Sequence, residues 1–407
     1  MTQTAVIMGG GFAGMCCAQV VSQHFEKTIM IEAHPFSVEE TASPQAAHLH
    51  VLMQRGREIL ESLFPGIDQA LAERQCLEID WAQDTLWISR HGAFPRYKSG
   101  IVTRSASRRF LEETMRRFIL ENKKIEVIDR FSVKDIIIEK DIVRRVVNRE
   151  GKEICGDFFV NAFGRQNPFG QQGHTDVSPL KVYYTSCLIR DFTCVDDYKQ
   201  IYVQMRPSAK PLGAVINPIE DGMHLLTLLT RDHAPFSDEG DVMQAVSSIS
   251  NDHFRRALAK ATIVSPMKKF CHSKGTRYVG KYRLHNMLTV GDAKCLFNPL
   301  YGQGMTISAM ESELIGKFLA KKRMVRQRHL TRIDQLPWLI AASEDYVLLS
   351  KDHDKVRSSV RIFKIFFDFG VKIAIKNSTV HRLFLEVLQM LRPVEKGLFA
   401  TLIGKRP

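Results

Sequence analysis

The sequence has no apolar run long enough to cross a membrane, and no signal peptide precedes its first apolar segment. These absences argue against an integral membrane protein and against a secreted one. The eight cysteines form neither a C-x-x-C pair nor a Cys/His spacing typical of metal sites, so we expect no bound metal. We expect reduced, mostly buried thiols in a cytoplasmic protein.

The chain also lacks a Ser/His/Asp signature, an internal repeat and any recognised nucleic-acid-binding motif. These absences give no support to side-chain nucleophilic catalysis, to a repeat architecture or to nucleic-acid binding. What remains is a chain of 407 residues with 44% apolar content, which predicts two to three domains around a large core.

Glycines near the N-terminus form one half of a nucleotide site. The segment Gly9-Gly10-Gly11-Phe12-Ala13-Gly14 follows the apolar run 4–8 and precedes a stretch of helical composition, 15–25. A strand, a tight turn and a helix in this order are typical of dinucleotide binding. Gly9 allows the turn, and Gly14 lets the helix pack closely on the strand.

Two further features support the same half-site. Gly11 lets a pyrophosphate approach the backbone, where the helix N-terminus offers N–H groups and its positive dipole end. A second strand, 28–31, ends in Glu32, about 20 residues beyond the glycines, where a carboxylate binds a ribose diol.

The second half of the site lies far downstream. A predicted buried strand, 286–290, delivers Gly291-Asp292-Ala293, so Asp292 lies at the carboxyl end of a strand and can accept from ribityl hydroxyls. The stretch 299–304 then leads into a predicted helix, 305–319, whose first N–H groups would point at a flavin pyrimidine. Together the two halves predict a chain that wraps a whole FAD.

A third segment, Asp157 to Arg165, completes a family resemblance. The chain resembles the single-component FAD-dependent aromatic hydroxylases, and within them it is most similar to the hydroxylase and epoxidase branch of polyketide and polyether antibiotic pathways. The stretches that carry the resemblance are 44–52, 107–112, 157–165, 291–293 and 301–305.

The resemblance implies a fold and a division of the chain. The fold class is α/β, with a Rossmann-like FAD-binding domain of the glutathione-reductase type, an antiparallel β-sheet substrate domain and a C-terminal helical segment. The expected boundaries are 1–75 plus 105–168 plus 275–325 for the FAD domain, 76–104 plus 169–274 for the substrate domain, and 326–407 for the helical region.

The resemblance also assigns residues to the cofactor. The positions that match FAD-binding ones are Gly9, Gly11, Phe12, Ala13, Gly14, Glu32, Arg108, Asp292, Gly302, Gly304 and Met305. The backbone of Pro299 and Gly302 matches the segment beside the reacting flavin ring. The loop from Gln45 to His50 is expected near the cofactor and the substrate entrance.

The reaction implied by the resemblance is oxygen transfer. Non-covalent FAD, reduced by NAD(P)H, reacts with O2 to a C4a-hydroperoxide that hydroxylates or epoxidises a mainly apolar natural-product intermediate. Because G-x-G-x-x-G occurs once, NAD(P)H is expected to bind transiently on the FAD domain. The family usually has Asp where this chain has Asn161, in a motif tied to both cofactors, which bears on how reduction proceeds.

The middle of the chain predicts the substrate side. Strand-like runs at 181–189, 200–205, 212–216 and 223–230 indicate an antiparallel sheet over the flavin. Aromatic residues and histidines are the candidates for contact with a small lipophilic substrate. The alternative is core packing for each aromatic residue and hydrogen bonding within a loop for the histidines. The candidates are His48, His50, Trp81, Trp87, Phe94, Tyr183 and Tyr184.

The positive charge is concentrated at the C-terminal end. The net charge is +13, and residues 321–407 contain 18 Lys and Arg against 8 Asp and Glu. Within 357–376 the basic residues recur at helical spacing around a broad apolar surface. One interpretation is a helix packed on the enzyme with its charges solvated. The other is a contact with an acidic carrier or a membrane surface, which would place the enzyme peripherally at the inner membrane.

Other functions on the same fold remain open at this stage. A flavin-dependent halogenase shares the cofactor fold, although its W-x-W-x-I-P segment is absent here. A flavin reductase of isoprenoid double bonds and a non-catalytic lipid escort are further alternatives, and the retained Gly291-Asp292 segment argues against the escort.

Overall fold

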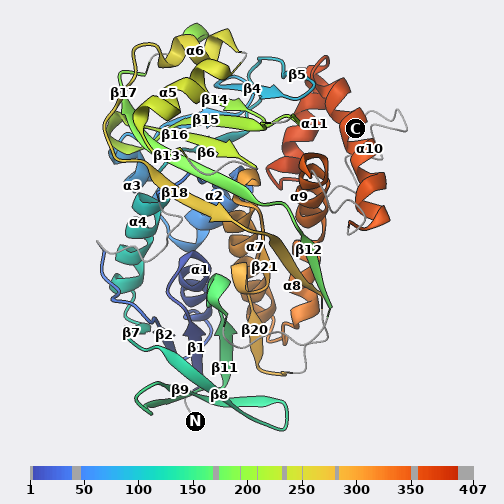
Figure 1. Ribbon diagram of the computed structural model, residues 1–407. Helices are drawn as coiled ribbons and strands as arrows, with labels where there is room; N and C mark the ends of the chain where they lie inside the picture. The colour runs from blue at the N-terminus through green and yellow to red at the C-terminus, as the bar shows by residue number, and fades with distance from the viewer. Residues whose placement is uncertain are drawn as a thin grey trace.

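The molecule is built from a lower parallel sheet, an upper mainly antiparallel sheet and a group of C-terminal helices (Figure 1). It is a computed structural model that describes residues 3–38, 47–167, 174–192, 194–208, 210–231, 236–249, 251–279, 284–349 and 356–392. The helices are α1 Phe12–Val21, α2 Gln54–Leu63, α3 Ile67–Glu73, α4 Arg108–Glu121, α5 Glu239–Ser248, α6 Asp252–Leu258, α7 Gln303–Ala320, α8 Gln327–Ile333, α9 Gln335–Leu348, α10 Ser358–Ala374 and α11 Ser378–Leu388.

Five strands form the parallel sheet, in the order β20-β11-β1-β2-β7, and every adjacent pair is parallel. They are β1 Thr4–Met8, β2 Lys27–Ile31, β7 Ile125–Ile128, β11 Phe158–Asn161 and β20 Met287–Thr289. Strand, turn and helix at the N-terminus, and the buried strand before Gly291, are confirmed. The α/β fold class, with its Rossmann-like sheet, is therefore confirmed.

Both faces of this sheet are covered, which explains why its strands are continuously apolar. Ala5 and Ile7 of β1 face the helical layer of α1, α2, α4 and α7, whereas Val6 and Met8 face a small antiparallel sheet. That sheet has the order β10-β9-β8 and consists of β8 Val133–Glu139, β9 Ile142–Asn148 and β10 Glu153–Cys155.

The segment 153–161 is divided into two strands, β10 and β11. The division occurs where the chain leaves the small antiparallel sheet and enters the parallel one. Gly156 permits the close crossing, because a Cβ there would lie 2.7 Å from Cγ2 of Val6. Asp157 then accepts a hydrogen bond at 2.8 Å from the backbone N–H of Thr4.

The upper sheet has eight strands, in the order β17-β13-β16-β15-β14-β4-β5, with β18 paired to β13. They are β4 Thr85–Ser89, β5 Gly92–Ala93, β13 Val182–Arg190, β14 Gln200–Val203, β15 Leu212–Pro218, β16 His224–Thr230, β17 Thr262–Ile263 and β18 Lys268–His272. The four predicted strands are present. One adjacent pair, β4 with β14, runs parallel rather than antiparallel, because β4 joins the sheet from an earlier excursion of the chain.

Smaller pairings connect these layers. β3 Glu78–Asp80 pairs with β6 Val102–Arg104, and a three-stranded sheet joins β12 His174–Ser178, β19 Gly275–Val279 and β21 Cys295–Leu296. Helices α5 and α6 pack on one face of the upper sheet. Strand β12 leads from the side of the lower sheet up to β13 of the upper one (Figure 1).

The C-terminal helices α9, α10 and α11 pack against one another beside the upper sheet, and α9 also contacts β12 (Figure 1). The expectation that the basic stripe of 357–376 is solvated is wrong for one member. Lys364 is buried, and its ammonium donates to Oε1 of Glu344 at 2.8 Å. Among the described residues, no helix is both long enough and apolar enough to cross a bilayer.

Buried charges fix the turn that carries Asp292. Lys294 is fully buried between Glu311 on α7 and Asp334 at the start of α9, with Nζ 2.5 Å from Oδ2 of Asp334. Glu311 also accepts a hydrogen bond at 2.8 Å from the backbone N–H of Gly291. Burial lowers the pKa of Lys294, but the two carboxylates outweigh this effect and raise it overall. The lysine therefore stays charged.

A second buried carboxylate fixes the segment that follows. Asp345 on α9 accepts hydrogen bonds from Ser178 Oγ at 2.5 Å, Tyr301 Oη at 2.8 Å and Asn298 Nδ2 at 3.1 Å. These bonds attach the turn around Pro299 to α9 and β12. Burial raises the pKa of Asp345 to about 6.

Replacing Lys294→Met should destabilise the fold by about 3–5 kcal/mol, because two buried carboxylates lose their shared cation. Lys317→Met is the matched control, since Lys317 lies on α7, is 58% exposed and pairs with Glu313. Its cost should be at most about 1 kcal/mol. Chemical denaturation of both variants measures the difference, and equal costs would contradict the role of Lys294.

The raised pKa of Asp345 predicts a pH dependence of stability. Between pH of about 4 and about 6 the folded chain binds this proton and the unfolded chain does not, so the free energy of unfolding falls as pH rises. The full change is about 3 kcal/mol. Asp345→Asn should remove it, so the difference between the two unfolding free energies should vary with pH in this window. If the unfolding free energies of the two proteins change equally with pH, the raised pKa of Asp345 is contradicted.

Candidate functional site

The first glycine turn is shaped by close backbone contacts. Gly9 has φ +114, and a Cβ there would lie 2.4 Å from the carbonyl oxygen of Ala162 on the segment after β11. A Cβ at Gly14 would lie 1.8 Å from the carbonyl oxygen of Gly9, so only glycine lets α1 approach β1 this closely. In front of Gly11 there is open space, with no atom within 4 Å of its would-be Cβ.

The two halves predicted from the sequence meet in space. A Cβ at Gly291 would lie 2.8 Å from Cβ of Ala13, which places the Asp292 turn directly against the N-terminus of α1. A Cβ at Gly304 would lie 3.9 Å from Oδ1 of Asp292. The first and last parts of the predicted site, about 280 residues apart in sequence, therefore form one surface.

Three neighbouring cavities run along this surface. The first, near Glu32, shares Gly11, Arg108, Arg165 and Asp292 with the second. The second lies along the N-termini of α1 and α7 and holds about 760 Å³ of empty space, part of it open to solvent. It shares the wall formed by Val51, Pro299, Gly302 and Gln303 with the third, a mainly apolar pocket with about 950 Å³ of such space. The shared walls define a path from Glu32 through Asp292 to the apolar pocket.

Two arginines surround Asp292. Nε of Arg165 lies 3.8 Å from Oδ2 of Asp292, and its guanidinium lies over the ring of Phe270. Burial raises the pKa of Asp292, and Arg108 and Arg165 oppose that shift. Burial lowers the pKa of Arg165. The middle cavity is thus positively charged at the point where a diphosphate or a polyol would pass.

The hydrogen-bonding groups along this path fit FAD. No described side chain caps α1 or α7, so their first backbone N–H groups can bind an anion or a reduced ring. Glu32 is held in place because Oε2 accepts from the N–H of Gly10 at 2.7 Å. Oε1 of Gln303 is buried without a hydrogen-bond partner in the described part of the chain, at the wall between the second and third cavities.

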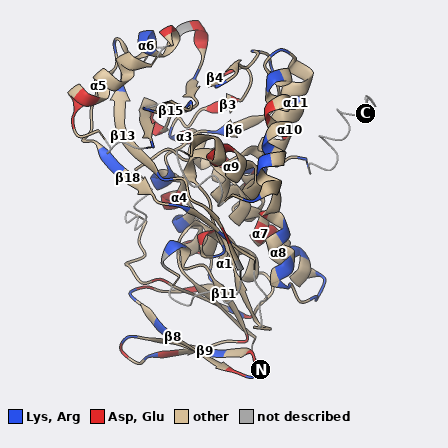
Figure 2. Cartoon of the chain, turned by 45° about the vertical axis from the view of Figure 1, so that its right-hand side comes forward, with Lys and Arg blue, Asp and Glu red and all other residues tan. Residues whose placement is uncertain are grey.

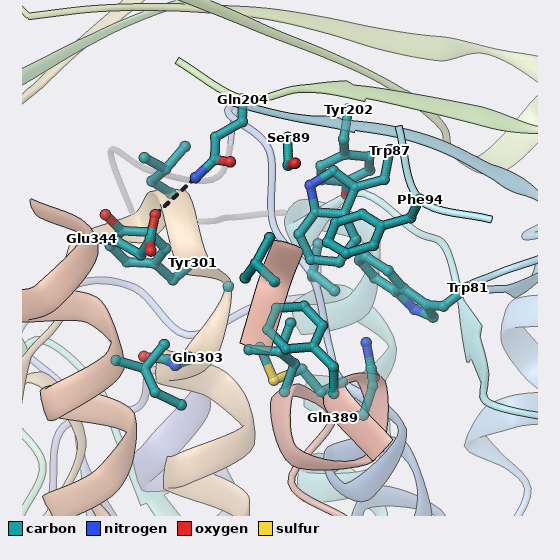
Figure 3. Close-up of a pocket in the computed structure, with 18 of the residues that line it drawn as sticks. Trp81, Trp87, Ser89, Phe94, Tyr202, Gln204, Tyr301, Gln303, Glu344 and Gln389 are labelled. Carbon is teal, nitrogen blue, oxygen red and sulfur yellow. Dashed lines mark hydrogen bonds between the residues drawn. The ribbon is translucent and has the colours of Figure 1, made fainter. Parts of the chain in front are cut away.

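Aromatic side chains line the third cavity (Figure 3). We call it the aromatic pocket, and its Trp, Tyr and Phe residues are Trp81, Trp87, Phe94, Tyr202, Tyr301, Phe367 and Phe384. The rings contact one another, with centroids 4.9 Å apart for Trp87 and Phe94 and 5.6 Å for Phe94 and Phe384. The pocket therefore favours an apolar, flat or extended ligand.

The aromatic pocket has one charged end, opposite the tryptophans in Figure 3. Glu344 accepts hydrogen bonds from Gln204 Nε2 at 2.8 Å, Lys364 Nζ at 2.8 Å and Arg90 Nη1 at 3.1 Å. Burial raises the pKa of Glu344 to about 7, against the opposing effect of Arg90. Asp368 on α10 completes the cluster through contacts with Arg90 and Lys364.

The predicted substrate candidates divide into two groups. Trp81, Trp87 and Phe94 line the aromatic pocket, and His50 lines the middle cavity. His50 is fixed by Nδ1, which donates to the carbonyl of His48 at 2.8 Å, and by Nε2, which accepts from Arg108 at 3.2 Å. Burial lowers its pKa well below the usual value, so it is neutral. Gln45 lies outside the described residues.

The other candidates lie behind the pocket walls. His48 is buried and hydrogen-bonded to Ser186, with a pKa lowered by burial to about 4. The hydroxyl of Tyr184 donates to Oδ1 of Asn298 at 2.7 Å. Tyr183 lies beneath the ammonium of Lys181. None of the three borders a cavity described above.

Asn161, where the resembling family usually has Asp, points into its own turn. It is 1% exposed, its Nδ2 donates to Asn167 at 3.2 Å, and its Oδ1 accepts from the N–H of Phe163 at 3.3 Å. Asn161 therefore shapes the turn that presents Gly164 and Arg165 to the cavities.

Some residues of the site were missed by sequence reasoning. Arg165 ends the segment 157–165 that carries the family resemblance, but no role was predicted for it. It lies in the 3-10 helix Gly164–Gln166, shortly after β11, and a place beyond the carboxyl end of a parallel strand was a usable signal. Arg90, Gln204 and Glu344 had no such signal, because they come from the turn after β4, the loop after β14 and α9. Within the described chain, no group of three or more His, Cys, Asp or Glu could hold a metal ion.

Comparison of sequences gives a distant relative. No protein-family model matches the chain. It is 26% identical over 344 residues to protein Rv3254 of Mycobacterium tuberculosis, covering 76% of this chain and 71% of that protein.

Solved structures cover nearly the whole chain. The flavin-dependent brominase Bmp2 superposes with a TM-score of 0.69 at 16% identity, covering 95% of this chain and 92% of that one. PqsL of Pseudomonas aeruginosa, a probable FAD-dependent monooxygenase, superposes with a TM-score of 0.64 at 13% identity, covering 90% and 99%. The chain thus has the fold shared by FAD-dependent monooxygenases and a flavin-dependent brominase.

Proposed function

We propose that this protein is an FAD-dependent monooxygenase that uses NAD(P)H and O2 to hydroxylate or epoxidise a small, mainly apolar molecule. The observation that carries the proposal is the path of cavities with shared walls. It joins the glycine turn of α1, the Asp292 turn and the N-terminus of α7, and continues into the aromatic pocket. A nucleotide shorter than FAD would not need the part of this path that runs from the Asp292 turn to the N-terminus of α7.

Each part of the path has a role toward bound FAD. Glu32 would bind the ribose of the adenosine part, and the N–H groups at the start of α1 would bind the pyrophosphate. Asp292 would accept hydrogen bonds from the ribityl chain. The N-terminus of α7, beside Gly302 and Pro299, would face the ring and stabilise negative charge on it. FAD, when bound and reduced, supplies the chemistry of oxygen activation.

The chain's own contribution is to bind and orient the substrate. The aromatic pocket shares Pro299, Gly302 and Gln303 with the cavity proposed for the ring, so a substrate there would lie beside the reacting edge. Its rings would exclude water and so limit side reactions beside the cofactor. The charged end at Glu344 would orient a substrate through a hydroxyl or carbonyl group.

Halogenation is a second candidate, because the fold is shared with a flavin-dependent brominase. Both reactions would use the same cofactor path and the same aromatic pocket. They differ in what is added to the product, so product mass separates them.

Asp292→Ala should reduce FAD affinity at least tenfold, because the ribityl chain loses its carboxylate partner; tenfold corresponds to about 1.4 kcal/mol. The control is Asp221→Ala, which removes an exposed carboxylate paired with Arg74. Flavin released per mole of folded protein measures occupancy. Full occupancy of the Asp292 variant would refute the cofactor assignment.

Turnover with labelled O2 tests the reaction. Apolar aromatic and polyene compounds should stimulate NAD(P)H and O2 consumption and yield a product heavier by one labelled oxygen. Phe94→Ala should raise the substrate KM roughly tenfold, since one pocket ring is lost. Tyr183→Ala, outside the pocket, is the control. NAD(P)H oxidation with no O2 uptake would favour a double-bond reductase, and bromide-dependent product would favour a halogenase.

A further inference from the structure

Helix α10 has an exposed apolar face. Five large apolar side chains, spaced at three, one, three and four residues, lie on one side of this helix. Their exposed fractions are 57% for Ile362, 69% for Ile365, 55% for Phe366, 57% for Phe369 and 38% for Ile373. We call this set the apolar face of α10. Contiguous apolar surface of this kind marks an interaction site rather than ordinary surface.

Basic residues border the apolar face. Arg361 and Lys372 lie on α10, and Lys376 follows its end, all toward the same side of the face in a helical projection. Lys372 and Lys376 are exposed and form no ion pair with any described residue. The single acidic residue of α10, Asp368, is engaged by Lys364 and Arg90. Figure 2 shows Lys and Arg along α10 and α11 at the edge of the molecule.

The opposite face of α10 forms part of the aromatic pocket. Phe367 and Val371 line that pocket, together with Phe384 and Leu388 of α11. One helix therefore separates the apolar face from the proposed substrate site. A helix with this arrangement lies in the interface plane of a bilayer, with its apolar side chains among the acyl chains and its cations at the headgroups.

We propose that α10 docks the protein on an anionic membrane surface. A second copy of the chain is a poorer occupant, because each copy brings the same unpaired cations and a net charge of +13. An anionic lipid surface complements both the apolar side chains and the lysines. Access of a lipophilic substrate from the membrane to the aromatic pocket would follow, and this last step alone rests on the proposed function.

Vesicle flotation tests the docking. The wild-type chain should bind vesicles of phosphatidylcholine with phosphatidylglycerol, and bind pure phosphatidylcholine more weakly. Ile365→Ser with Phe369→Ser should lower partitioning by about tenfold or more, since two inserted side chains are lost. The matched control is Leu120→Ser with Ile138→Ser, two exposed apolar residues on α4 and β8, 49% and 48% exposed.

The charge contribution is tested separately. Lys372→Gln with Lys376→Gln should lower binding to the anionic vesicles about fivefold or more and leave binding to pure phosphatidylcholine unchanged. Lys123→Gln with Lys124→Gln, two exposed lysines after α4, is the control. Salt at about 1 M, where the screening length is roughly 3 Å, should abolish the anionic preference.

Other results would overturn the proposal. Wild-type protein that stays unbound to both vesicles, or control variants that lose as much binding as the test variants, would refute it. Serine variants that change the sedimentation of the protein from dimer to monomer without changing vesicle binding would assign the face to a second copy. Flavin content, measured on the same samples, keeps the outcome separate from the proposed function, because neither test pair contacts the cofactor path.

Discussion

The site depends on one close packing contact, where the N-terminus of α1 meets both β1 and the Asp292 turn. Gly14 touches the carbonyl of Gly9, and Ala13 touches Gly291. No larger side chain fits at either point without moving backbone, and interiors packed at this density do not deform gradually. The contact thus sets the distance between the two sequence motifs, and with it the width of the cavity that runs between them.

Buried charges hold the second motif in this position. Lys294 joins the Asp292 turn to α7 and α9, and Asp345 joins the following turn to α9 and β12. Removing Lys294 leaves two buried carboxylates without their cation, and removing Asp345 leaves buried donors without an acceptor, so either change is costly. Such clusters favour a single geometry for the segment that would lie against a flavin ring, and they make that geometry hard to alter by small steps.

The sequence predicted the parts of the structure that local rules control. The glycine spacing, the apolar strands of the parallel sheet and the helix after Gly302 are visible in short windows, because their causes are local. Tertiary packing controls the rest. Tyr183 and Tyr184 have similar composition signals to Trp87 and Phe94, yet only the second pair borders the aromatic pocket. The burial of Lys364 depends on Glu344, and that partner cannot be recognised from the spacing within α10.

The carboxylate of Glu344 has donors from three separate parts of the chain, with Arg90 after β4, Gln204 after β14 and Lys364 on α10. A shift of α10 would remove a cation from this carboxylate and raise its affinity for a proton. Linkage is reciprocal, so whatever alters the protonation of Glu344 from inside the pocket also biases the position of α10. The position of α10 and the protonation of Glu344 are therefore coupled, so that a change in one shifts the equilibrium of the other.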